Sequence, residues 1–286
     1  MKKRHTKLPR WQKLPVSELH MAEAFLKSRE KFCVSASARF RKIKESKDTV
    51  WYIPGSGSEI SAIILQSGQT LFPVFNGNTG IPEPLFLRRF LYKVHVHAAQ
   101  GLREDAELLE ALMEGLGYYA SERVDYALMG LDGEPRPEAL RAGPMGLILR
   151  PPVAGDEDGL FALQSAYEKE EVLPKNADFS PAACRLNLQN IISSERLLVA
   201  ELDGQVVGKI NTSAESFTRY QIGGVYVRPD CRGRRIAEKM TAFISRDLVA
   251  GGKGVTLFVK KHNDAALKVY LRAGFNTLAD YRITYF

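Results

Sequence analysis

The sequence predicts an α/β protein with two successive domains, each built from a sheet and flanking helices. Short β-branched and aromatic runs alternate with amphipathic helical patterns along most of the chain. A stretch rich in Gly and Pro at 131–144 is typical of a linker and divides these patterns into two groups. With 286 residues, 45% of them hydrophobic, the chain is long enough to bury two cores. We therefore expect a basic tail at 1–15, an N-terminal domain at 16–145 and a C-terminal domain at 146–286.

The residue pattern in the first half of the sequence predicts alternating helices and strands. Apolar residues at spacings of three and four mark the helices, and Ser67-Gly68 supplies the turn of a β-hairpin. The expected helices span 17–31, 84–91 and 104–116, and the expected strands span 59–66, 69–75, 94–98 and 122–130.

The residue pattern at the start of the second half of the sequence predicts two helices between strands. Ser180 suits the N-cap of the second helix, because Pro181 follows at the first helical position. Asp203-Gly204 is a pair typical of a type I′ turn and indicates a β-hairpin. In chain order, the expected elements are a strand at 147–150, helices at 156–171 and from 181 onward, and strands at 196–201, 205–210 and 220–227.

The last of these strands runs through a basic turn directly into another helix. The apolar residues of this helix recur at spacings of three and four, and Gly251-Gly252 ends it. The start of such a helix presents unpaired backbone N–H groups and the positive end of the helix dipole. Three arginines add charge there: Arg232, Arg234 and Arg235. The turn is therefore a candidate site for a phosphate or pyrophosphate.

Two motifs in this region resemble the GCN5-related N-acetyltransferase (GNAT) superfamily. Residues 232–237, Arg-Gly-Arg-Arg-Ile-Ala, are similar to its acetyl-CoA motif, in which Arg or Gln precedes two residues, Gly, one residue, and Gly or Ala. Residues 263–275 match the next motif, Asn-x-x-Ala-x-x-x-Tyr-x-x-x-Gly-Phe, at every named position. A strand at 255–259 joins the two motifs. The resemblance covers about the last half of the chain and implies a mixed, mostly antiparallel sheet flanked by helices.

The resemblance implies acetyl-CoA as a co-substrate and direct transfer of its acetyl group to a primary amine. In that fold the two strands before and after the cofactor helix splay apart around the pantetheine arm, and Gly223-Gly224 fits the bulge that opens the gap. The resemblance implies that Tyr270 donates a proton to the departing thiolate; a helix tyrosine that packs under the sheet is the alternative. The residues implied to bind the cofactor are Val225, Tyr226, Val227, Arg232, Gly233, Arg234, Arg235, Ile236, Ala237, Asn263 and Tyr270.

The sequence leaves the general base open. Gln221 stands where many members of the superfamily carry a glutamate, and a glutamine cannot take the proton. Glu170 and Glu171, at the end of the first expected helix, are the candidate catalytic carboxylates; a solvated charged face, a water chain or an acceptor that arrives deprotonated are the alternatives.

Arg235 is a second departure, because it replaces the middle glycine of the cofactor motif. Its side chain must point outward, or the phosphate must sit slightly higher; an outward Arg235 could reach a CoA phosphate. Together with Gln221, this substitution leaves open a different class of function, a non-catalytic acyl-CoA-binding sensor or scaffold.

The order of elements in the first half echoes that of the second. We therefore hypothesise a degenerate acetyltransferase-like repeat that has lost its cofactor site, as in a group of bacterial acetyltransferases; an unrelated small α/β domain is the alternative. Residues 76–82 fall where the cofactor motif belongs and contain no basic residue. Residues 55–58 resemble a phosphate loop only superficially, because no Lys follows them. His95 and His97 could share a metal ion, but the sequence offers no third ligand nearby, so no metal site is expected.

Composition limits the partners and the compartment. The formal net charge of +7 could bring the basic tail to nucleic acid, but Trp11 is its only aromatic residue, which favours a solubilising role. No apolar run is long enough to span a bilayer. Cys33, Cys184 and Cys231 are odd in number and far apart, which predicts reduced thiols in a cytoplasm and no metal cluster. The expected partner is a small-molecule or peptide amine, with no membrane, and a homodimer is left open.

Overall fold

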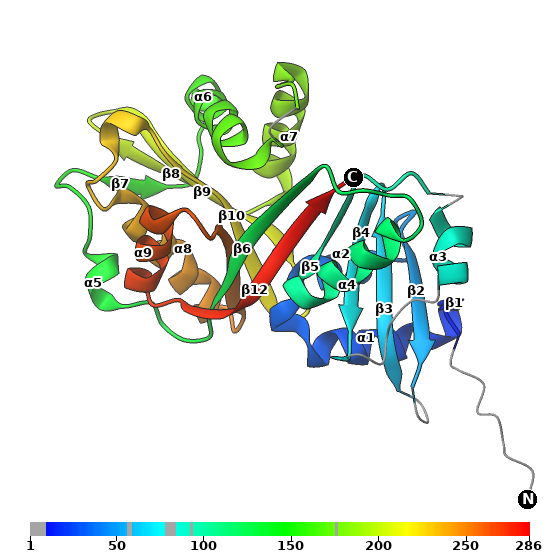
Figure 1. The fold of residues 1–286 in the computed structure, drawn as a ribbon. Coiled ribbons are helices and arrows are strands. Elements are labelled where there is room, and N and C mark those ends of the chain that lie inside the picture. The colour runs from blue at the N-terminus through cyan, green and yellow to red at the C-terminus, as the bar shows by residue number, and fades with distance from the viewer. Residues whose placement is uncertain (1–9, 56–58, 78–83, 92–93, 175–176) are drawn as a thin grey trace, which may run out of the picture. The chain divides into compact units, whose positions relative to one another are not determined.

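The chain forms two compact units. The computed structural model describes residues 10–55, 59–77, 84–91, 94–174 and 177–286 (Figure 1). Unit 1 consists of Met1–Tyr126 with Asp280–Phe286, and unit 2 consists of Ala127–Ala279. The predicted class, mixed α/β with a mostly antiparallel sheet, is confirmed. The units differ from the predicted ranges, because residues 127–145 belong to the second unit and the end of the last strand belongs to the first.

The sheet of unit 2 contains the order β11-β10-β9-β8-β7. Neighbouring strands are antiparallel, except that β10 and β11 are parallel. The strands are β7 (Ile148–Arg150), β8 (Leu197–Leu202), β9 (Gln205–Glu215), β10 (Arg219–Val227) and β11 (Gly254–Lys260). β6 (Glu122–Leu131) and β12 (Asn276–Tyr285) each have residues in both units. The hairpin between β8 and β9 turns at Asp203-Gly204, where both φ angles are positive, as a type I′ turn requires.

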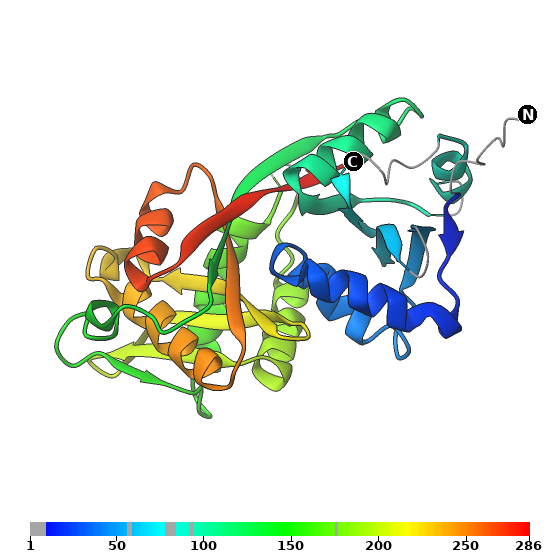
Figure 2. The same ribbon diagram turned by 90° about the horizontal axis from the view of Figure 1, so that it is seen from below.

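Helices cover both faces of this sheet (Figures 1 and 2). On one face lie α6 (Glu157–Tyr167), which continues into a π-helical turn at Glu168–Val172, and α7 (Pro181–Ser194). On the other face lie α8 (Ile236–Ala250) and α9 (Asp264–Ala273). The apolar stripe predicted for α8 is confirmed, since Ile236, Met240, Ile244 and Leu248 are buried in the core of the unit. A short helix, α5 (Pro137–Leu140), occupies the predicted linker.

Unit 1 repeats the order of elements seen in unit 2. In both units two helices precede three antiparallel strands, a helix, a strand parallel to the third, another helix and a last strand. In Figure 2, α1 and α2 lie on one face of the sheet of unit 1 and α4 on the other. The elements are β1 (Gln12–Lys13), α1 (Leu19–Ser28), α2 (Val34–Arg41), β2 (Thr49–Pro54), β3 (Ile60–Ser67), β4 (Thr70–Phe75), α3 (Pro84–Leu91), β5 (Ala98–Leu102) and α4 (Arg103–Glu114). This order supports the repeat over an unrelated domain.

Three elements of unit 1, β1, α2 and β2, are not predicted from the sequence, and one predicted strand is displaced. The strand expected at 94–98 is wrong, because β5 begins where that range ends. β5 is rich in small residues of low β-propensity, and it pairs with β4 at Thr70 and Leu71 and with the end of β12. Pairing with neighbouring strands therefore decides the position of this strand, not its own propensity.

The start of the chain also differs from the prediction. Trp11, within the expected tail, is only 8% exposed; its ring stacks on Phe86 and meets Phe75 edge-on. Gln12–Lys13 pair with β2. Residues 10–15 thus join unit 1, because an indole buried among aromatic rings is stabilised by its large apolar area. Residues 1–9 of the tail, 56–58 of the loop-like segment and 78–82 of the segment without basic residues lie outside the described residues.

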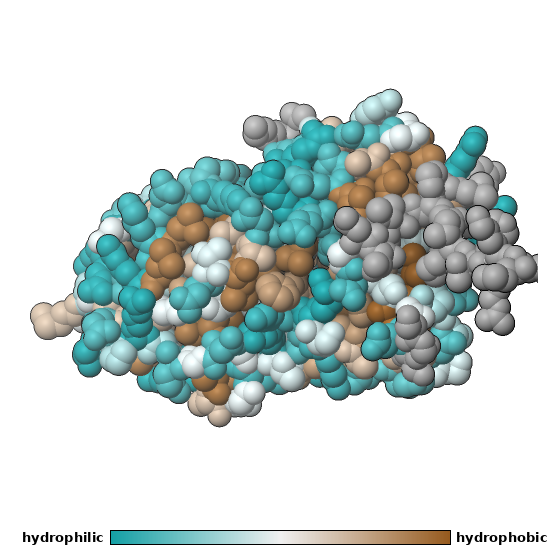
Figure 3. All heavy atoms as spheres, turned by 60° about the horizontal axis from the view of Figure 1, so that its bottom comes forward, coloured by the Kyte–Doolittle hydropathy of each residue, from teal (hydrophilic) through white to brown (hydrophobic). Residues whose placement is uncertain are grey.

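The surface is mixed in character. On the face drawn in Figure 3, hydrophobic residues form separate areas among hydrophilic ones. Within the part of the chain that the structure describes, no helix combines the length and the apolar character needed to cross a bilayer.

Candidate functional site

The parallel pair β10 and β11 opens into a gap in the middle of the sheet of unit 2. The two strands pair from Arg219 opposite Gly254 to Ile222 opposite Leu257. On the other side, the register of β10 with β9 passes from Gly223 directly to Tyr226, so Gly224 and Val225 form a bulge. Gly224 has φ +58°, a conformation that favours glycine. The bulge predicted at the glycine pair therefore lies just where the pairing with β11 ends.

Two tyrosines converge on this bulge. Tyr167, at the end of α6, accepts a hydrogen bond from the Gly224 N–H with an N–O distance of 3.3 Å. Tyr270, on α9, is 7% exposed, and its pKa is raised well above the usual value by burial and by the proximity of Tyr167 and Glu171. Its phenol therefore keeps its proton at neutral pH. A protonated phenol beside the gap can donate a proton to a leaving group.

Glu170 is held by the residues that follow β10. The Arg232 guanidinium donates to it with an Nη2–Oε2 distance of 2.8 Å, and the Tyr226 hydroxyl donates to its other oxygen. Burial acts to raise the pKa of Glu170, but these two hydrogen bonds and the charge of Arg232 hold it below its ordinary value. Arg232 also donates from Nε to the Val227 carbonyl at 3.1 Å. Glu170 is thus an ion-paired carboxylate, which is a poor arrangement for accepting a proton.

Glu171 contacts the opposite side of the gap. Asn263 Nδ2 donates to its carboxylate at 3.2 Å, and Lys260 Nζ lies 3.4 Å from its other oxygen. Asn263 Oδ1 in turn accepts from the Ala266 N–H at 3.0 Å and caps α9. Two of the three glutamates of the π-helical turn therefore contact the two sides of the gap, Glu170 on the β10 side and Glu171 on the β11 side.

The turn at residues 232–237, which leads into α8, has the backbone shape of a glycine turn although Arg235 occupies one of its positions. Arg235 has φ +59° and occupies the N-cap position of α8, where no side chain accepts a hydrogen bond from the helix. Its guanidinium does not extend freely outward but pairs with Glu238, at Nη2–Oε1 2.6 Å and Nε–Oε2 3.0 Å. Arg234 is exposed beside it. The first turn of α8 is therefore open for an anion, and its charge comes from Arg232 and Arg234.

Gln221 lies on β10, two residues before the bulge region, and is 8% exposed. Its Nε2 donates to Ser213 Oγ at 3.1 Å on the neighbouring strand β9. The side chain is thus bound within the sheet.

Lys209 is a residue of this site that the sequence analysis missed. It is 0% exposed, and its Nζ donates to Asn211 Oδ1 and to the Gly224 carbonyl, both at 3.0 Å. Burial lowers the pKa of Lys209 to about 7, against the opposing influence of Glu168 and Cys184. The signal in the sequence is a lysine inside the apolar run Val206-Val207-Gly208-Lys209-Ile210. Such a lysine would ordinarily be placed on the exposed face of an alternating strand.

The remaining predictions concern metal ligands and thiols. Nowhere in the described ranges do three or more His, Cys, Asp or Glu side chains gather as a metal site would require. His95 and His97 are exposed, and the His97 ring packs against Tyr285 within unit 1. Cys33, Cys184 and Cys231 are all buried free thiols.

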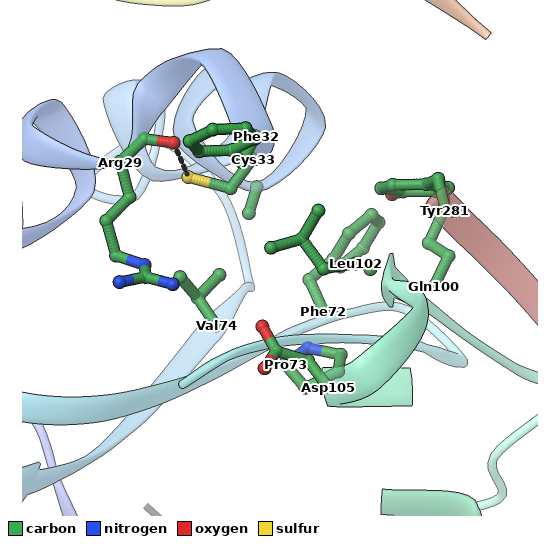
Figure 4. Close-up of a pocket in the computed structure, with 12 residues that line it drawn as sticks. Arg29, Phe32, Cys33, Phe72, Pro73, Val74, Gln100, Leu102, Asp105 and Tyr281 are labelled. Atoms are coloured by element: carbon green, nitrogen blue, oxygen red, sulfur yellow. Dashed lines mark hydrogen bonds between the residues drawn. The ribbon is translucent and has the colours of Figure 1, made fainter. Parts of the chain in front are cut away.

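Unit 1 contains a similar opening with different chemistry. β4 and β5 pair only at Thr70 opposite Ala98 and Leu71 opposite Ala99. Beyond these pairs lies a small hollow (Figure 4). Pro73 on one strand has no N–H to offer, and burial raises the pKa of Asp105 to about 6. A gap with a buried carboxylate and a proline does not fit an acyl-CoA, whose phosphates are anionic and whose pantetheine needs backbone donors.

Comparisons with known proteins agree with this arrangement. Residues 161–275 match the family model described as the acetyltransferase (GNAT) family. An acetyltransferase of Pectobacterium atrosepticum is 32% identical over 84 residues, which cover 28% of this chain and 57% of that protein. The chain thus spans little more than half the length of this curated relative.

Solved structures resemble the whole chain in fold. A GCN5-related N-acetyltransferase from Sphaerobacter thermophilus has a TM-score of 0.59 at 19% identity, covering 97% of this chain and 96% of that one. A tandem GNAT protein from the clavulanic acid biosynthesis pathway has a TM-score of 0.56 at 12% identity, covering 96% and 97%. The tandem arrangement accounts for the repeated order of elements in units 1 and 2. Residues 161–275 therefore form a domain of the acetyltransferase (GNAT) family, within a chain that has the fold of a tandem GNAT protein.

Proposed function

We propose that the chain is an acetyl-CoA-dependent N-acetyltransferase that moves an acetyl group directly to a primary amine. The observation that carries this proposal is the bulge at Gly224 and Val225, which lies at the opening between β10 and β11 and beside the protonated Tyr270. The acceptor is a small-molecule or peptide amine, and the reaction takes place in the cytoplasm.

The cofactor is assigned to the residues around the gap. The N–H groups at the start of α8, with Gly233, Ile236 and Ala237 in the turn, would hold the pyrophosphate. Arg232 and Arg234 add positive charge. Arg235 itself adopts the left-handed backbone conformation of the turn. The backbone of Val225, Tyr226 and Val227 would bind the pantetheine, and Asn263 fixes the start of α9 beside it.

The transfer requires three events at the bulge. The lone pair of the neutral amine attacks the thioester carbon and forms the C–N bond, the tetrahedral intermediate collapses with cleavage of the C–S bond, and the nitrogen loses a proton to the general base while the thiolate takes one from Tyr270. The carbonyl oxygen becomes negative in between and needs an N–H donor. Both candidate carboxylates are ion-paired, and Glu171 is the better general base because its contact with Lys260, at 3.4 Å, is longer than the 2.8 Å contact of Glu170 with Arg232.

A second candidate function is a non-catalytic acyl-CoA sensor. It is favoured by one observation: the carboxylate of Glu170 forms an ion pair with Arg232, the arginine expected to bind the pyrophosphate. The two functions differ in the release of free thiol from acetyl-CoA.

Incubation with acetyl-CoA and a panel of amines, followed by a thiol-detecting reagent, separates them. Amine-dependent release of thiol supports the transferase, and tight binding of CoA without release supports the sensor. Tyr270→Phe should reduce turnover and leave the affinity for acetyl-CoA within about twofold. Tyr119→Phe, a change of the exposed Tyr119 in unit 1, is the matched control and should have no effect. Equal turnover in Tyr270→Phe would remove this residue from the mechanism.

A further inference from the structure

We propose that Lys209 is a positioning residue that holds the Gly224 carbonyl, so that the Val225 N–H points into the gap toward the carbonyl of a bound thioester. This inference rests on the proposed function and deepens it. It assigns a role to a side chain that neither cofactor motif includes.

The burial of Lys209 calls for an explanation. A lysine amine without exposure to water loses its hydration, which is unfavourable by several kcal/mol unless the amine finds partners. Lys209 has two, the Asn211 amide oxygen and the Gly224 carbonyl, each at 3.0 Å. A neutral amine carries two N–H bonds, so both are used. The second partner is part of the backbone of the bulge, not of a side chain.

The bulge leaves the backbone of β10 in need of such a partner. In the register of β10 with β9, Tyr226 is opposite Lys209 and Gly223 is opposite Asn211, with Gly224 and Val225 between them. The pairing of β10 with β11 has already ended at Ile222. A carbonyl that leaves the ladder needs another donor, and Lys209 supplies it from β9.

Because the Gly224 carbonyl is held, the orientation of the next N–H group, that of Val225, is fixed as well. The Gly224 carbonyl and the Val225 N–H belong to one peptide plane, and in a trans peptide they point in opposite directions. Lys209 Nζ, which also lies 5.1 Å from the centre of the Tyr167 ring, holds the carbonyl on its own side of β10. The Val225 N–H is therefore directed away from Lys209, to the side where we place the thioester.

A second side chain fixes the preceding peptide. The Gly224 N–H donates to the hydroxyl of Tyr167, and Lys209 Nζ lies 5.1 Å from the centre of the Tyr167 ring. There is no room for any residue but glycine between these groups. A Cβ on Gly224 would lie 2.1 Å from Asn211 Oδ1 and 2.6 Å from Lys209 Nζ. Both peptides of the bulge are therefore held in one orientation before a thioester binds, which is the condition for effective stabilisation of a developing oxyanion.

The test uses the carbonyl stretch of bound acetyl-CoA labelled with ¹³C at the thioester carbonyl, measured by infrared difference spectroscopy. A hydrogen bond to this carbonyl lowers its frequency. The unaltered chain should show the lowered frequency, and Lys209→Met should lose most of the shift while binding CoA within about threefold of the unaltered chain. Lys268→Met, the same change at an exposed lysine on α9, is the matched control and should keep the shift.

Tyr167→Phe provides a second variant in case Lys209→Met fails to fold, and it should lose part of the shift. With an accepted amine in hand, Lys209→Met should lower kcat at least tenfold, toward the roughly hundredfold loss seen when an oxyanion donor is removed, and leave KM for acetyl-CoA within about twofold. An unchanged frequency in both variants, with CoA still bound, would overturn the role of Lys209 and leave the proposed function intact. If the unaltered chain binds neither CoA nor acetyl-CoA, the proposed function and this role both fail.

Discussion

Stability should depend on pH through Lys209, and replacing it by Met should remove that dependence. Burial lowers the pKa of Lys209 from 10.5 to about 7 in the folded chain, whereas the unfolded chain exposes an ordinary lysine. Between these two values the unfolded state binds more protons than the folded state. The free energy of unfolding therefore rises with pH across this window, and the unfavourable contribution of Lys209 is largest below pH 7.

The size of the effect follows from the shift. One pKa unit corresponds to about 1.36 kcal/mol. Lys209 is about half protonated in the folded chain at pH 7, so the gain from pH 7 to pH 8.5 is below the full slope, between about 1 and 2 kcal/mol. Glu168, from the π-helical turn, and Cys184, from α7, face the amine and act against the shift, so their charges are already part of this value.

Urea unfolding at pH 7 and pH 8.5, followed by circular dichroism, measures the increment. Other groups titrate in the same range, so the informative quantity is the increment of the unaltered chain minus that of Lys209→Met. We expect this difference to be between about 1 and 2 kcal/mol. Lys268→Met should behave as the unaltered chain does, because Lys268 is exposed. Equal increments in Lys209→Met and the unaltered chain would show that the Lys209 amine is charged and hydrated in the folded state, contrary to the reasoning.

Three other substitutions test the surroundings of the gap. Glu170→Gln frees Arg232 and should tighten CoA binding by about threefold at low salt, with less gain at high salt, as measured by calorimetry; weaker binding would show that the carboxylate helps to hold the cofactor. Gly224→Ala places a methyl group 2.1 Å from an amide oxygen at φ +58° and should lower the urea midpoint steeply; a midpoint equal to that of the unaltered chain would contradict the tight packing of the bulge. Arg235→Gly relieves about 1 kcal/mol of left-handed strain but removes the closest cation from the buried Glu238, so we expect a net loss of stability that Glu238→Gln in the same chain restores; a gain in stability from Arg235→Gly alone would refute this balance.

The elements predicted well are those fixed by local rules. The helix after Asn263 begins with the Asn263 side-chain cap and ends at Gly274, whose φ is +108°. Both signals lie within the helix's own sequence and need no partner elsewhere. The hairpin at Asp203-Gly204 and the stripe of α8 are of the same kind, because their backbone shape and periodicity can be seen in a short window.

The elements predicted poorly depend on distant partners. β5 forms where β4 and β12 offer backbone groups, although residues 94–98 alternate more regularly. The buried Trp11 needs the rings of Phe75 and Phe86, which come from other elements of unit 1. No local pattern carries this information, since it arises only when the sheet has assembled.

The sequence motifs locate the part of the candidate site that is proposed to bind the cofactor. They do not indicate the residues around the Gly224 bulge, where the acyl group is proposed to lie. The motif residues lie in one strand, one turn and two helices, so their spacing already indicates a phosphate site. Lys209 acts on Gly224 across fifteen residues, and Glu170 meets Arg232 across sixty-two. In the sequence, Lys209 is a lysine within a strand, and Glu170 belongs to the charged end of a helix. Only the placement of β9 and the π-helical turn against β10 gives them a role.

The two openings in the chain show why the fold alone does not assign the chemistry. Both units contain a parallel pair that separates after a few residues. In unit 1 the opening is bordered by Pro73 and by Asp105, whose carboxylate is mostly charged at neutral pH despite a pKa of about 6, so it offers few backbone donors and repels phosphates. In unit 2 the opening is bordered by a glycine bulge with oriented peptides, a protonated Tyr270 and an arginine turn. Topology would permit an acyl-CoA in both places, whereas the residues favour unit 2, and we therefore assign the proposed transfer to unit 2 alone.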